Sequence, residues 1–138
     1  MNAARQAVKI NPDYPAAQFN LGFASGKLNN FSEAVAAFKE ATRTRPDWAE
    51  AWNNLGFAYG GLKQWKDAIE AHKKAIELNS NYAGAIYNVG VDYFQSGNKK
   101  EAMEQYKILQ EKNPTLADNL YFIMNKRLPS QTGRGSSY

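Results

Sequence analysis

Residues 49–82 read AEAWNNLGFAYGGLKQWKDAIEAHKKAIELNSNY, and this stretch decides the fold because its pattern returns along the chain. Its Asn54-Leu55-Gly56 has counterparts 34 residues earlier and 34 residues later, at 20–22 and 88–90. The other positions that keep this step are Ala34, Ala68 and Ala102, then Pro12, Pro46, Ser80 and Pro114, and also Tyr14, Trp48, Tyr82 and Leu116. A fixed period of this length indicates a repeat array, in which each unit buries its apolar side only against its neighbours.

Apolar residues within each unit are spaced as on two successive amphipathic helices. In the quoted stretch one apolar stripe runs over 51–62 and a second over 65–78, and Asn79-Ser80-Asn81 ends the unit. The same spacing predicts helices over 15–28, 31–44, 83–96 and 99–112. Gly97-Asn98 is the clearest turn between paired helices, because glycine supplies the left-handed backbone that ends a helix. The sequence therefore predicts an all-α fold built from helix–turn–helix units.

Both flanks keep the register of the array. Residues 2–10 match a second helix, since Ala7 precedes Ala41 by the period, and residues 117–128 match a first helix, since Leu120 follows Ile86 by the same step. The expected organisation is 1–14 as part of a preceding repeat, 15–48, 49–82 and 83–116 as three full repeats, 117–128 as a terminal helix and 129–138 as a disordered tail. The tail is rich in Ser and Gly and cannot pack a core.

Composition narrows the class of protein. The chain has 138 residues, of which 43% are apolar and 22% charged, and its net charge of +4 is mild. A nucleic-acid partner is not expected, because nucleic-acid-binding proteins concentrate basic residues more strongly on one face. No apolar run approaches the ~20 residues of a membrane span, and the N-terminus lacks the apolar core of a signal peptide. We expect a soluble chain, cytoplasmic by default, although the sequence does not identify a compartment.

The residue types needed for catalysis are sparse. The absence of cysteine excludes disulfides, thiolate chemistry and Cys-based metal sites. His72 is the single histidine, and it occupies an aromatic core position, so we expect a packed side chain and not a base or a ligand. The sequence holds no Gly-rich phosphate loop, no nucleophile–base pair and no metal-ligand cluster. The chain is therefore not expected to be an enzyme, and no cofactor or metal is expected.

These units resemble the tetratricopeptide repeat, whose pattern sets Trp, Leu-Gly, Tyr, Ala, Phe, Ala and Pro at fixed offsets. The matching residues are Pro46, Trp52, Leu55, Gly56, Tyr59, Ala68 and Ala75 in the second unit, Leu21, Gly22, Ala34, Phe38 and Ala41 in the first, and Gly90, Tyr93, Ala102, Tyr106 and Pro114 in the third. The departures are Gln18 for the Trp, Ser25 for the Tyr, His72 for the Phe, and Lys99 where Phe31 and Trp65 stand earlier. The resemblance covers residues 2 to about 128 and implies a right-handed superhelix of antiparallel helix pairs, with the small residues where helices cross closely.

The resemblance also implies that the first helix of each unit lines a concave groove. The candidate peptide-binding residues are Phe19, Asn20 and Phe23, then Asn53, Asn54 and Phe57, then Tyr87, Asn88 and Val91. A carboxamide can donate to and accept from one peptide unit, so Asn20, Asn54 and Asn88 suit an extended backbone. This row is similar to the asparagine ladder in the repeat region of O-linked N-acetylglucosamine transferase. The alternative is that these asparagines bind only water.

Phe19, Phe23, Phe57 and Tyr87 make the expected groove aromatic, which favours a protein interface, although they could instead fill gaps between repeats. The family also has a two-carboxylate clamp for chaperone tails, which needs basic residues and Asn on the first and third helices. Here those places hold Phe19, Phe23, Gly84 and Asn88, and only Asn54 matches. The sequence therefore favours a non-catalytic scaffold that binds an extended peptide or partner segment without such a clamp.

The half-repeats at the two ends suggest an alternative function, a self-assembling structural protein. The terminal helix of one molecule could dock on residues 2–10 of the next, through Ala7 and Ile10 on one side and Leu120, Ile123 and Met124 on the other. Such a head-to-tail contact is heterologous and generates a fibre or a ring. The competing interpretations are that the chain is cut from a longer repeat protein, or that 117–128 is an ordinary cap.

Overall fold

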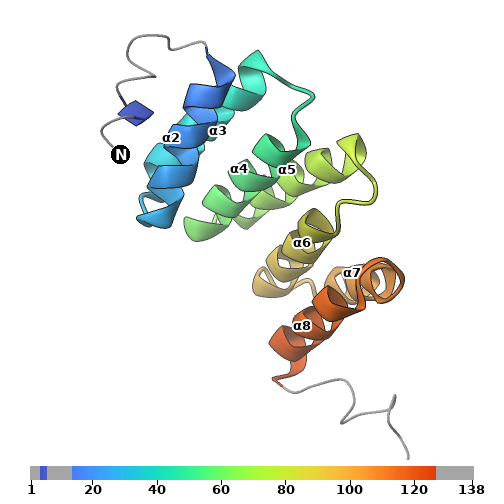
Figure 1. The fold of residues 1–138 in the computed structure, drawn as a ribbon. Helices are drawn as coiled ribbons and strands as arrows, with labels where there is room; N and C mark the ends of the chain where they lie inside the picture. Colours follow the sequence, from blue (N-terminus) through green and yellow to red (C-terminus); the bar gives the residue numbers. More distant parts are fainter. Residues whose placement is uncertain (1–3, 6–13, 127–138) are drawn as a thin grey trace, which may run out of the picture. The chain divides into compact units, whose positions relative to one another are not determined.

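The computed structural model describes residues 4–5 and 14–126, and all regular structure in those residues is helical. The helices are α2 (Pro15–Lys27), α3 (Phe31–Thr44), α4 (Ala49–Gly61), α5 (Trp65–Leu78), α6 (Ala83–Gln95), α7 (Lys99–Lys112) and α8 (Pro114–Asn125) (Figure 1). The all-α prediction is confirmed. Two compact units divide the chain, Met1–Ser80 with α2 to α5 and Asn81–Tyr138 with α6 to α8.

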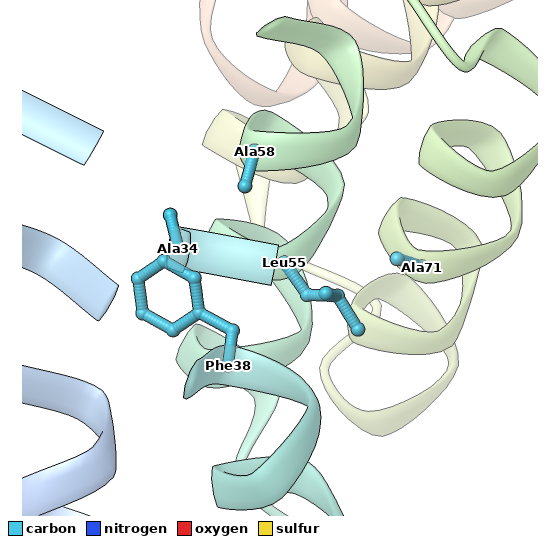
Figure 2. Close-up of a cluster of buried hydrophobic side chains, with 5 residues drawn as sticks. All are labelled: Ala34, Phe38, Leu55, Ala58 and Ala71. Carbon is cyan, nitrogen blue, oxygen red and sulfur yellow. The ribbon is translucent and has the colours of Figure 1, made fainter. Parts of the chain in front are cut away.

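In the first unit, α2 packs against α3, α4 packs against α5, and α3 packs against α4. Small and large side chains alternate across these contacts, so that the helices approach closely while the rings fill the space between them. A central cluster of buried residues comprises Ala34, Phe38, Leu55, Ala58 and Ala71 (Figure 2). Of the alanines in this cluster, Ala34 and Ala58 have no exposed surface.

Each turn between paired helices contains one residue with left-handed backbone, at the same position of the period. These residues are Asn29, Lys63 and Gly97, with φ of 62°, 59° and 90°. The following amide reaches back over each turn, in bonds of Asn30 to Ser25, Gln64 to Tyr59 and Asn98 to Tyr93 at 2.8, 3.0 and 2.7 Å. This is the Schellman arrangement that satisfies the last carbonyls of a helix. The predicted turn at Gly97 is confirmed, and the other two turns adopt its geometry without glycine.

The repeated glycines lie where first helices meet their neighbours. A Cβ on Gly22 would stand 2.8 Å from the Phe38 ring, and one on Gly56 would stand 2.5 Å from the His72 imidazole. At Gly90 the nearest atom is Leu120 Cδ2 of α8, at 2.7 Å. A side chain at any of these positions would force its neighbour to shift, which agrees with the expectation that these positions mark close crossings.

Three departures from the repeat pattern, Gln18, Ser25 and His72, are all buried. Ser25 replaces an aromatic ring, and its hydroxyl donates to Glu33 Oε1 at 2.9 Å. His72 is 1% exposed and fills the place of the expected Phe, as a packed histidine should. Lys99, the fourth departure, is exposed at the start of α7.

In the second unit, α6 packs against α7, and α8 packs against both. α8 begins at Pro114, three residues before the helix expected over 117–128. Two features favour the earlier start: proline at the first helical position, and an Asn113 side chain that accepts from the Leu116 amide at 3.1 Å. Within the described ranges, the equivalent places hold Arg45-Pro46, without a capping acceptor of this kind, and Asn79-Ser80, without the proline, whereas Asn11-Pro12 lies outside those ranges.

Several expectations fall on residues outside those the structure describes. They are most of the helix over 2–10, including Ala7 and Ile10, the end of the terminal helix and the tail over 129–138. Ala4 and Arg5 are described and helical, and the Arg5 guanidinium contacts Glu33 on α3 through two bonds of 3.0 and 2.8 Å. No helix in the described ranges is long and apolar enough to cross a membrane.

Candidate peptide-binding site

The first helices of the first unit carry very little charge. The only charged residue of α2 is Lys27 and the only one of α4 is Glu50, whereas α3 and α5 are strongly charged. The charged residues of α3 and α5 are Glu33, Lys39, Glu40 and Arg43, and Lys66, Asp67, Glu70, Lys73, Lys74 and Glu77. The contacting pair α2 and α4 therefore forms an almost uncharged face, which we term the first-helix face.

Phe23 of α2 and Phe57 of α4 occupy equivalent positions on the first-helix face, and both are unusually exposed, at 50% and 56%. They flank a pocket of about 330 Å³ that is also lined by Gly22, Gly26, Lys27, Phe38 and Asn54. We term this the Phe23–Phe57 pocket. It brings together three residues predicted to bind peptide, Phe23, Asn54 and Phe57, with neighbours that were not predicted as binding residues.

Neighbouring rings hold the pocket wall at Phe57 in place. Phe31, the first residue of α3, meets Phe57 edge to face with ring centroids 6.1 Å apart. The Phe31 ring in turn lies against Gly61, where an added Cβ would be 2.5 Å from it. On the other wall the Lys27 ammonium lies over the Phe23 ring, 5.1 Å from its centroid. The Phe23 and Phe57 rings are therefore exposed to water, and each also contacts a neighbouring side chain.

Phe19 has a different role from Phe23. Its ring stacks on Trp48 at 4.5 Å and meets Phe38 edge to face at 5.6 Å. The other ring of this stack, Trp48, has the Arg45 guanidinium 4.9 Å from its centroid. Phe19 is half-buried and packs against the first unit's own core, as the gap-filling alternative describes.

The predicted asparagines of the first unit differ in exposure. Asn20 is exposed, whereas Asn53 and Asn54 are half-buried, and Asn54 lines the Phe23–Phe57 pocket. The Asn54 carboxamide is therefore placed beside an apolar pocket, where a peptide unit would be partly shielded from water. Hydrogen bonds gain strength when water is excluded.

The candidates of the second unit lie on α6 and are all half-buried, namely Tyr87, Asn88 and Val91. Burial raises the pKa of the Tyr87 phenol, so this side chain stays neutral over the ordinary pH range. Tyr87 and Asn88 correspond by the period to Asn53 and Asn54 of the first unit.

The α8 residues predicted for self-assembly face largely inward, whereas Ala7 and Ile10 lie outside the described residues. Leu120 has no exposed surface and Met124 is 6% exposed, while Ile123 is half-buried. Leu120 packs against Gly90 within the same unit. The large apolar residue that α8 does expose is Phe122, at 47%. An amphipathic pattern alone does not tell which apolar residues of a terminal helix meet its own unit.

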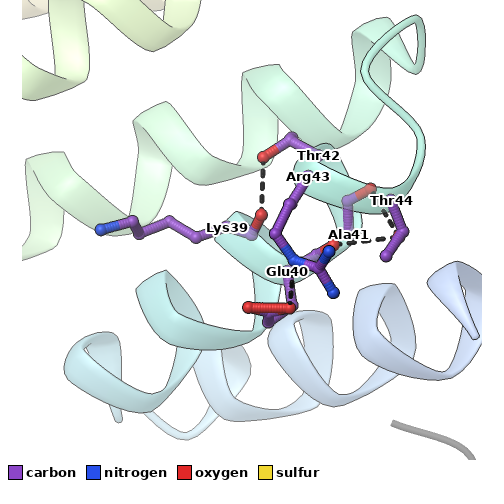
Figure 3. A network of polar contacts seen from close by, with 6 residues as sticks. All are labelled: Lys39, Glu40, Ala41, Thr42, Arg43 and Thr44. Carbon is purple, nitrogen blue, oxygen red and sulfur yellow. Dashed lines mark hydrogen bonds and ion pairs between the residues drawn. The ribbon is translucent and has the colours of Figure 1, made fainter. Parts of the chain in front are cut away.

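A second hollow, of about 480 Å³, lies over the other side of α4, and the sequence analysis did not predict it. Its floor is formed by Trp52, Leu55, Tyr59 and Ala71, and its rim by Lys39, Thr42, Arg43, Asp67, Glu70 and Lys74. The rim residues of α3 already have local partners: Thr42 donates to the Lys39 carbonyl at 3.0 Å, and Arg43 pairs with Glu40 at 2.8 Å (Figure 3). Its charges have both signs, so it does not select one kind of ligand.

Within the described ranges, no group of three or more His, Cys, Asp or Glu side chains could hold a metal ion. The exposed carboxylates of the second helices form surface pairs such as Lys74 with Glu77 at 3.6 Å. Such pairs are ordinary features of solvated helices.

A stack of antiparallel helix pairs with a nearly uncharged first-helix face defines a helical-repeat scaffold for protein–protein interaction. Family models described as tetratricopeptide repeat match residues 49–82 and 85–115, and one described as TPR repeat matches residues 26–63. The chain is a tetratricopeptide repeat protein, as the resemblance implied. No curated protein matches the sequence.

Solved structures with the same fold include two structures of MamA and a TPR domain of OM64. A crystal structure of MamA superposes with a TM-score of 0.83 at 26% identity, over 89% of this chain and 71% of that one. MamA 41-end from Desulfovibrio magneticus RS-1 gives 0.78 at 23% identity, over 83% of this chain and 64% of that one. The Arabidopsis OM64 TPR domain gives 0.76 at 19% identity, over 81% of this chain and 94% of that one.

Proposed function

We propose that the chain is a non-catalytic scaffold and that its first unit binds an extended segment of a partner protein across the first-helix face. The observation that carries this proposal is the pair of exposed rings, Phe23 and Phe57, on a face with almost no charge. Exposed aromatic side chains on a rigid support are favoured anchors of interfaces, because their burial releases water at little entropic cost.

The asparagines give the face a means of holding backbone. Asn20 and Asn54 occupy equivalent positions on adjacent first helices, and each carboxamide can both donate to and accept from one peptide unit. Asn53 lies one position earlier on α4 and would border the segment, whereas Phe19, its counterpart on α2, packs against the core. In the second unit, Asn88, Tyr87 and Val91 hold the corresponding positions and form a further candidate surface on α6.

Selection from a displayed library of random peptides tests this function. We expect peptides that bind the intact chain and lose about tenfold or more in affinity for the double variant Asn20→Ala, Asn54→Ala, since each lost backbone pair costs about 0.5–1.5 kcal/mol. The matched control is Asn119→Ala, which removes an exposed carboxamide from α8. Failure to enrich any peptide, or equal binding to the double variant, would contradict the proposal.

Self-assembly is the second candidate function, and the exposed ring of Phe122 on α8 is the observation that favours it. Light scattering over a wide concentration range measures it directly. Mass that grows with concentration and returns to 15.5 kDa in Phe122→Ser would support assembly through α8. A constant mass of one chain would exclude it.

A further inference from the structure

We propose that the Phe23–Phe57 pocket is the anchor subsite for a bulky apolar side chain of the partner segment, and that the segment carries a carboxylate beside that side chain. This inference rests on the proposed function and names the chemistry that the first-helix face selects.

The size and lining of the pocket suit one large apolar side chain. Its volume of about 330 Å³ lies at the lower end of the range for ligand pockets. Phe23 and Phe57 provide the two walls, and Gly22 and Phe38 lie between them. Gly26 leaves the space open, since a Cβ on it would meet no atom within 4 Å.

Each exposed ring of the pocket already has a contact with a neighbouring side chain. Phe31, which does not line the pocket, contacts the Phe57 ring, and the Lys27 ammonium at the rim lies over the Phe23 ring. Phe23 and Phe57 are each about half exposed to water. A ligand that covers them gains the hydrophobic free energy without first ordering the rings.

The charge at the rim has one sign. Lys27 is the only charged residue among those that line the pocket, and α2 contains no acidic residue to oppose it. Its ammonium lies over the Phe23 ring, at one wall of the pocket. The complementary group on the partner segment is a carboxylate next to the apolar side chain.

Two small probes separate the apolar and the charged parts of this inference. N-acetyl-L-phenylalanine and its uncharged carboxamide are titrated into the full chain while backbone amide shifts are recorded by NMR. We expect both to shift Phe23, Lys27 and Phe57, and the acid to bind about two- to fivefold more tightly, the range of an exposed ion pair. In Lys27→Gln, the preference for the acid should disappear.

Gly26→Leu tests the pocket itself, because it places a side chain in the open space while replacing a helical glycine. We expect binding of both probes to fall about tenfold or more while the melting temperature stays equal or rises. The control is Gly84→Leu on α6, where a Cβ would only make an ordinary contact of 3.6 Å with Tyr82. Unchanged binding to Gly26→Leu, shifts confined to other residues, or equal binding of the acid and the amide would overturn the inference.

The probe titration and the peptide selection can fail separately, so failure of the anchor subsite is distinguishable from failure of the proposed function. Selected peptides that depend on Asn20 and Asn54 but bind Gly26→Leu normally would leave the proposed function intact and remove the anchor subsite. Probes that occupy the pocket when no peptide can be selected would leave a small-ligand site and remove the proposed function.

Discussion

The imidazole of His72 on α5 lies directly over the backbone of Gly56 on α4, so close that an added Cβ would stand 2.5 Å from Nε2. His72 is almost completely buried, so the ring has no outward path. The close crossing of these two helices therefore depends on the missing side chain at 56. Gly22 and Phe38 repeat the relationship in α2 and α3.

We expect Gly56→Ala to lower the free energy of unfolding by about 1–3 kcal/mol, the usual cost of overpacking a core. Denaturant unfolding followed by circular dichroism measures the change. Gly26→Ala is the control, since its Cβ meets nothing and it should gain about 0.5–1 kcal/mol from helix propensity. A neutral Gly56→Ala would mean that the two helices can move apart freely.

Lys63 holds left-handed backbone that costs a side chain about 1 kcal/mol or more, whereas glycine adopts it freely. We expect Lys63→Gly to raise the free energy of unfolding by about 0.5–1 kcal/mol. Asn29→Gly, at the equivalent turn, should gain less because asparagine tolerates this conformation. Equal gains at both turns would show that the side-chain type is immaterial there.

Leu120 and Phe122 are two residues apart on α8 and have opposite environments. Leu120 is fully buried, whereas Phe122 is 47% exposed. Leu120→Ala should cost about 2–5 kcal/mol of stability, as a cavity does. Phe122→Ala should change stability by no more than about 0.5 kcal/mol. Thermal and denaturant unfolding distinguish the two, and a large loss in Phe122→Ala would assign that ring to the core. A charged residue at 120 therefore tests folding and not assembly.

The Arg5–Glu33 pair gives stability a pH dependence of known sign. The hydrogen bond from Arg5 lowers the pKa of the Glu33 carboxyl below its ordinary value of 4.5. A carboxyl whose pKa is lower in the folded state stabilises the fold above the unfolded pKa, and this contribution is lost as pH falls through the folded pKa. The effect should be small, since the pair is exposed to solvent. The free energy of unfolding of Glu33→Gln should therefore be slightly lower than that of the wild type at pH 7 and equal to it at pH 2–3. A difference of the same size at both pH values would contradict the assignment.

The period of 34 residues determined the fold from sequence alone, because each unit repeats the same apolar spacing and the same small residues at the crossings. It also placed the helices, the packed His72 and the glycine turn at 97. The turns at Asn29 and Lys63 could have been found by extending the period from Gly97, since all three occupy one position.

The tertiary structure decided which apolar residues face water. Periodicity assigned Phe19 and Phe23 to one groove. In the folded chain Phe19 stacks on Trp48, whereas Phe23 stays exposed. The burial of Phe19 depends on Trp48, a ring nearly thirty residues away, so local pattern could not predict it. In the same way, Leu120 is buried because it packs against Gly90 on α6. Lys27 lies at the rim of the pocket because its ammonium lies over the Phe23 ring. Local pattern sets which side of a helix is apolar, whereas contacts distant in sequence set which part of that side remains free to bind.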